Sequence, residues 1–93
     1  MQRSESSRHC WVDVFEEGYF LGPMRRLFGP RKLRQLHAKS MIVGPRATVL
    51  LSVRCRGRES VVKLAAKRVI PDLAKSIHGA TIRKATVERA GRL

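Results

Sequence analysis

Acidic residues are scarce in this 93-residue chain: seven Asp and Glu stand against 20 Lys and Arg, which gives a net charge of +13. From Gly18 onward only Glu59, Asp72 and Glu88 are acidic, and that stretch carries a net charge of +15. Such a surface attracts polyanions. Nucleic acid is the commonest polyanion, and anionic lipid or an acidic protein surface comes next, so we expect a polyanionic partner. The alternative is a basic but inert surface.

Long hydrophobic runs are also missing, because no stretch reaches the roughly 18 apolar residues that a transmembrane helix needs. The polar N-terminus, residues 1–8, lacks the apolar stretch of a secretory signal. We therefore expect an intracellular protein, with secretion after removal of a leader as the alternative. A hydrophobic content of 43% is that of a folded protein, and the length predicts one domain with a modest core.

Cysteine is limited to Cys10 and Cys55, which are too far apart in the sequence for a C-x-x-C motif. This spacing indicates neither a zinc site nor a dithiol redox site. The pattern around Cys55 favours a small buried side chain. A disulfide between the two cysteines stays open at this point.

Residues that could form a catalytic set do not come together in the sequence. His37 and His78 precede predicted strands and are expected in loops, and two histidines without a nearby carboxylate make a poor metal site. Glu16 and Glu17 are neighbours on a predicted turn, which suits a solvated surface better than an acid–base pair. We therefore expect no catalytic residues, and a protein that is not an enzyme.

Short alternating apolar runs separated by Gly and Pro dominate the chain and predict strands. One short helix is expected near 71–76, because Pro71 and Asp72 suit a first helical turn. The pattern predicts an all-β fold of about eight strands in two Greek-key motifs that form a small β-sandwich. The predicted strands cover 10–15, 20–28, 40–43, 47–53, 60–64 and 81–88, with 31–36 as a strand or a helical turn.

The predicted domain spans 10–90 after a flexible tail at 1–9, with motif one at about 10–44 and motif two at about 46–90. Its two halves share a pattern at an offset of 35 residues: two apolar positions five residues apart, followed two residues later by glycine. The first copy is Phe15, Phe20 and Gly22, and the second is Leu50, Cys55 and Gly57. We expect both glycines to follow tight hairpins that need a left-handed backbone.

The sequence Phe15-x4-Phe20-x-Gly22 resembles the aromatic signature of the βγ-crystallin Greek key. Residues 40–45 are similar to the closing strand and link of a first motif, and residues 69–73 with 81–88 are similar to the helix and closing strand of a second. The resemblance covers about 10–90 and implies a β-sandwich in which Phe15 covers the first hairpin and Phe20 enters the core. Leu50, Cys55 and Gly57 keep the spacing of the signature in the second motif without its aromatic bulk.

The same resemblance implies two calcium sites, each formed by acidic or amide residues and hydroxyls just before a closing strand. The aligned segments are 35–40 and 79–84, where ligand side chains have mostly become apolar or cationic. Calcium requires oxygen ligands and negative charge. We therefore expect no cofactor and the loss of calcium binding. The degenerate positions are Gln35, Lys39, Ser40, Gly79, Arg83 and Lys84.

Basic residues gather in short runs at predicted turns and strand ends, where a sandwich would bring several together at its ends. Trp11 and Tyr19 are the candidates for base stacking, but we expect Trp11 in the core, which favours contact with phosphates over base readout. The candidates for polyanion binding are Arg25, Arg26, Arg31, Lys32, Arg34, Arg54, Arg56, Arg58, Lys67, Arg68, Arg83 and Lys84.

Three functions follow from these features. The first is a non-enzymatic βγ-crystallin-like module with a structural or interaction role, strongly basic and without calcium. The second is a basic protein associated with nucleic acid, for instance within a ribonucleoprotein. The third is a secreted inhibitor or a toxin-like protein.

Overall fold

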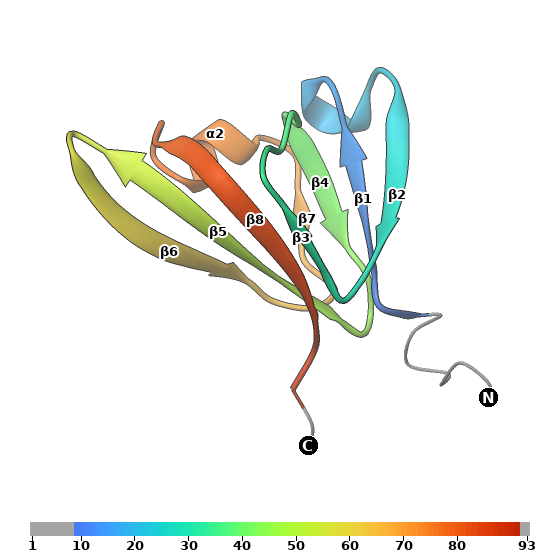
Figure 1. Ribbon diagram of the computed structural model, residues 1–93. Helices are drawn as coiled ribbons and strands as arrows, with labels where there is room; N and C mark the ends of the chain where they lie inside the picture. Colours follow the sequence, from blue (N-terminus) through green and yellow to red (C-terminus); the bar gives the residue numbers. More distant parts are fainter. Residues whose placement is uncertain (1–8, 92–93) are drawn as a thin grey trace.

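A computed structural model describes residues 9–91 and shows two packed sheets (Figure 1). The elements are β1 (Trp11–Phe15), η1 (Gly18–Phe20), β2 (Met24–Phe28), β3 (Arg31–Leu33), β4 (Ser40–Val43), β5 (Ala47–Cys55), β6 (Arg58–Leu64), β7 (Val69–Ile70), α2 (Leu73–Ser76) and β8 (Thr81–Arg89). The all-β class, the eight strands and the short helix near 71–76 are confirmed. The two-residue strand β7 was not predicted, because its run is cut short by Pro71.

The two four-stranded sheets are antiparallel and exchange one strand each. The first sheet has the order β2-β1-β4-β7 and the second β3-β8-β5-β6. Thus β3 leaves the first half to pair with β8, and β7 leaves the second half to pair with β4. The two sheets are equivalent, because β1 to β4 of the first half correspond to β5 to β8 of the second. When each strand is replaced by its counterpart, the order β2-β1-β4-β7 becomes β6-β5-β8-β3, which is the second sheet read from its other edge. The exchange ties the halves into one sandwich, as a Greek-key connection requires.

Alternation along the central strands builds the core. Val12 and Val14 of β1 point inward, and so do Val49, Leu51 and Val53 of β5. Aliphatic side chains from both sheets pack against each other there, and removing their apolar surface from water stabilises the sandwich. Leu73 and Ile77 close the core at one end, where α2 is positioned by an Asp72 side chain that accepts a hydrogen bond from the Lys75 N–H.

The first hairpin folds back on itself through η1, between β1 and β2. Tyr19 and Phe20 have positive φ angles of 56° and 63°, and Gly22 follows at 79°. The strand predicted at 20–28 therefore begins only at Met24. Phe20 is half-buried and not in the core: its ring makes an edge-to-face contact with Phe15, with centroids 5.5 Å apart.

The second hairpin is straight, so the expected equivalence of the two copies is wrong. Arg56 and Gly57 form a two-residue turn with φ angles of 54° and 80°, the combination that a type I′ turn needs. Strand β5 consequently runs on to Cys55, which is exposed and not buried. Leu50 lies on the outer face, between the buried Val49 and Leu51.

The strand registers give the true correspondence between the halves. Val12 pairs with Val43 and Val49 with Val87, so the first strands correspond at an offset of 37 residues, not 35. By the same rule Phe15, which pairs with Ser40, corresponds to Ser52, which pairs with Lys84.

Several local predictions can also be compared with the structure. Trp11 is half-buried on the outer face of the first sheet and is not a core residue. Cys10 and Cys55 are both free thiols. Of the predicted tail at 1–9, residues 1–8 lie outside the described part of the chain, as do residues 92–93. Within residues 9–91 no helix has the length and apolarity to span a bilayer.

Candidate functional site

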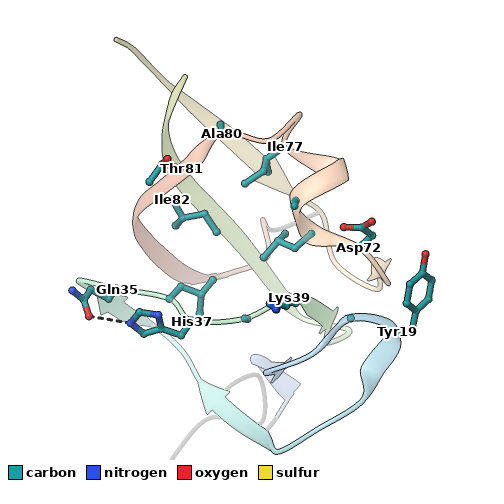
Figure 2. A pocket seen from close by; sticks show the side chains of 14 residues that line it. Tyr19, Gln35, His37, Lys39, Asp72, Ile77, Ala80, Thr81 and Ile82 are labelled. Atoms are coloured by element: carbon teal, nitrogen blue, oxygen red, sulfur yellow. Dashed lines mark hydrogen bonds between the residues drawn. The ribbon is translucent and has the colours of Figure 1, made fainter. Parts of the chain in front are cut away.

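A groove of about 540 Å³ opens at the end of the sandwich that carries η1 and α2 (Figure 2). One wall is the 35–39 loop before β4, and the other is α2 with the first residues of β8. Leu36, Leu73, Ile77 and Ile82 form much of its surface, and Lys39 and Asp72 place one charge of each sign on its rim. The groove lies beside the positions that the family resemblance assigned to calcium.

The first set of calcium positions is used for other contacts. Ser40 is fully buried; its Oγ accepts a hydrogen bond from the Phe20 N–H at 2.9 Å and donates one to the Glu17 carbonyl. Gln35 Oε1 lies 3.2 Å from His37 Nε2. Lys39 brings an ammonium next to the serine. The only hydroxyl of this set thus holds the first hairpin closed, and its neighbour carries the wrong charge for a cation site.

The second set offers still less to a cation. Gly79 has a φ angle of 75° and ends the turn after α2, while Arg83 and Lys84 are exposed on β8. Two positive charges therefore stand where oxygen ligands would be required. The residues present do not fit calcium in either half. In the described part of the chain, 9–91, no three His, Cys, Asp or Glu side chains come together as a metal site.

The strongest charge feature is the outer face of the second sheet. Pairing places Lys32, Thr86, Leu50 and Lys63 in one row across β3, β8, β5 and β6. The next row contains Lys84, and a register shift between Ser52 and Val53 adds the exposed Arg83. Arg54 follows Ser52 by two residues on β5 and pairs with Glu59 of β6. We name this surface the cationic face; it consists of Lys32, Arg54, Lys63, Arg83 and Lys84.

Glu59 is an exposed acidic residue beside the cationic face, and the positive charges of that face affect its pKa. Its carboxylate accepts a 2.6 Å hydrogen bond from Arg54. That bond and the charge of Arg54 hold the pKa of Glu59 below its usual value, and the charges of Arg83 and Lys84 act in the same direction. Three cations from two strands thus surround one exposed acid, and the face keeps an excess of positive charge.

The remaining basic candidates lie elsewhere. Arg56 and Arg58 flank the tip of the β5–β6 hairpin, Lys67 and Arg68 belong to the loop before β7, and Arg34 follows β3. Arg25 lies on the edge strand β2. Clustering at the ends of the sandwich was expected; instead Arg26, Lys32 and Lys84 are interior residues of β2, β3 and β8.

One polar cluster was missed by sequence reasoning. Arg26 forms two hydrogen bonds to Asp13, from Nε at 2.7 Å and from an Nη at 2.9 Å, and its guanidinium lies 3.8 Å from the centre of the Trp11 ring. The hydrogen bond raises the pKa of Arg26 above its ordinary value. Alternation in β1 places Trp11 and Asp13 on the same side, which is the signal that could have revealed the cluster.

Comparisons with known proteins bear on the fold. No protein-family model and no curated protein matches the sequence. Among solved structures, the chain is similar to one described in terms of the evolution of the eye lens βγ-crystallin domain fold. The TM-score is 0.69 at 15% sequence identity, and the match covers 89% of each chain. The described chain therefore has a βγ-crystallin-like fold.

Proposed function

We propose that this protein is a non-enzymatic βγ-crystallin-like interaction module that binds nucleic acid through the phosphates and does not bind calcium. The observation that carries the proposal is the cationic face, where Lys32, Lys84 and Lys63 come from β3, β8 and β6 of one sheet and lie on its outer side. Lysine and arginine on such a surface neutralise phosphates without reading sequence.

The loss of calcium follows from the donor chemistry on both sides of the groove. Lys39, Arg83 and Lys84 would repel a divalent ion, and Ser40 Oγ already has two backbone partners. We expect isothermal titration with calcium to give no binding heat and no rise in the melting temperature. Micromolar binding would overturn this part of the proposal.

Filter binding of DNA and RNA at two salt concentrations tests the polyanion contact. Five phosphate contacts predict that affinity falls by about two to three orders of magnitude between roughly 50 and 200 mM salt. No retention at about 50 mM salt would refute the proposal.

A matched pair of variants tests the location. Lys63→Glu with Lys84→Glu lowers the net charge to +9, and so does the control, Lys67→Glu with Lys75→Glu, which lies off the cationic face. Salt dependence is the slope of the logarithm of the affinity against the logarithm of the salt concentration. The first variant should reduce this slope by the equivalent of about two phosphate contacts, and the control by less than one. Equal losses would mean that binding follows total charge and has no defined face.

A further inference from the structure

The aromatic side chains of this protein lie outside its core. All five occur within residues 11–28, and none is among the fully buried residues. Aromatic rings usually dominate protein cores, because they carry the largest apolar area. Here they lie on the outer face of the first sheet or in the hairpin folded over it. They are Trp11, Phe15, Tyr19, Phe20 and Phe28.

Strand β2 presents a row of flat or flexible side chains along this face. Met24, Arg26 and Phe28 pair with Phe15, Asp13 and Trp11, which are the outward residues of β1. Alternate residues of a strand are about 6.8 Å apart, so the row offers three regularly spaced contact positions. Met24 and Phe28 remain 48% and 52% exposed, although both are large and apolar.

Arg26, in the middle of the row, is held in place by its neighbours. Two hydrogen bonds to Asp13 hold its guanidinium, whose central carbon lies 3.8 Å from the centre of the Trp11 ring, and Asp13 neutralises its charge. Trp11 in turn packs against Gly44, where a Cβ would lie 2.7 Å from the indole ring. A planar guanidinium fixed in this way is a surface on which a nucleobase can stack.

The row leads directly to cationic residues at the sandwich edge. After Phe28 the chain passes through Gly29 and Pro30 into β3, the edge strand of the second sheet (Figure 1). Phe28 and Lys32 are four residues apart, at most about 14 Å along the backbone. Arg31 and Lys32 are exposed there. A flexible polyanion can therefore run from the row on β2 over this edge to the cationic face.

We propose that the row of Met24, Arg26 and Phe28 is a stacking platform for the bases of single-stranded nucleic acid. The inference rests on the proposed function, because it assumes a nucleic-acid partner, and it adds base contact on the opposite sheet. Charge selects this occupant: a second copy brings another +13 to the interface, whereas a single strand brings phosphates for the edge and flat bases for the row.

The test compares a 12-nucleotide oligo-dT with an abasic oligomer that has the same number of phosphates. Trp11 is the only tryptophan, so its fluorescence reports contact at the platform directly. At about 50 mM salt we expect oligo-dT to quench Trp11 and to bind about tenfold more tightly than the abasic chain. Equal affinities for the two oligomers would overturn the platform and leave the phosphate contact intact. Failure of both to bind would refute the proposed function itself.

Variants locate the effect. Phe28→Ala should weaken oligo-dT binding about tenfold and leave abasic binding unchanged. Phe28→Leu keeps apolar surface without a ring and should lose most of the same affinity. Val61→Ala removes an exposed apolar side chain from the second sheet and should change neither affinity. Full affinity in Phe28→Leu, or a dimer in sedimentation that Phe28→Ala dissociates, would show apolar docking or self-association instead and overturn the proposal.

Discussion

Ser40→Ala is expected to open the first hairpin. Ser40 Oγ joins two backbone groups from the folded segment, the Phe20 N–H and the Glu17 carbonyl, and Ser40 itself is fully buried. Alanine fits the site but leaves both backbone groups without this partner. An unsatisfied buried polar group costs about 1–3 kcal/mol, and the two here are only partly buried, so we expect a loss of about 2–4 kcal/mol in the free energy of unfolding.

That loss is large for a domain of this size, whose total stability is about 5–15 kcal/mol. It corresponds to a fall of roughly 10–25 °C in the melting temperature, measured by circular dichroism, with urea unfolding as a second measurement. Ser60→Ala, on the exposed part of β6, is the matched control and should change stability by less than about 0.5 kcal/mol. A loss below about 0.5 kcal/mol in Ser40→Ala would show that the serine does not hold the hairpin.

Three further outcomes follow from buried and exposed groups. In the native protein a thiol reagent should modify the exposed Cys55 quickly and the buried Cys10 only on unfolding, so two equally fast thiols would contradict the fold. Burial raises the pKa of Cys10, so the contribution of this thiol to stability is complete below its ordinary pKa of 9.0 and is lost as pH rises above it. The free energy of unfolding, measured with urea from pH 7 to 10, should therefore decline at high pH, and Cys10→Ala should make this decline smaller. Gly44→Ala should cost about 1–3 kcal/mol in thermal unfolding and shift Trp11 emission, because its Cβ would clash with the indole, and an unchanged spectrum would contradict that contact.

The elements that sequence reasoning placed correctly are those with local signals. Residues 40–43 form a strand with the bounds that their apolar run indicated, and Asp72 caps the helix that Pro71 and Asp72 predicted. Gly22 and Gly57 have the positive φ angles that tight turns require. In these cases the propensity of a few neighbouring residues decides the backbone, and tertiary contacts agree with it.

The error in the second hairpin arises because the same residue spacing is compatible with two hairpin shapes. The spacing Leu50-x4-Cys55-x-Gly57 copies the first hairpin, but Arg56 and Gly57 suffice for a two-residue turn, so β5 and β6 stay paired to the tip. Of the cationic face, Lys32, Arg54, Arg83 and Lys84 were predicted as candidates but were expected at the ends of the sandwich, and Lys63 was not predicted. Which face a lysine occupies depends on register, and β3 joins the second sheet through an exchange that no local pattern records.

Lys84 explains both the straight second hairpin and the positive charge of the second sheet. Lys84 corresponds to Ser40, since each pairs with the corresponding residue of its neighbouring strand, Ser52 or Phe15. A lysine cannot be buried there as the serine is without losing the hydration of its charge. Lys84 is exposed, so at this position the second half has no hydroxyl that could hold a folded hairpin over the sheet. The uncovered sheet then exposes Arg54, Lys63 and Lys84 together, and the same substitution puts an ammonium where the family resemblance would place a calcium ligand.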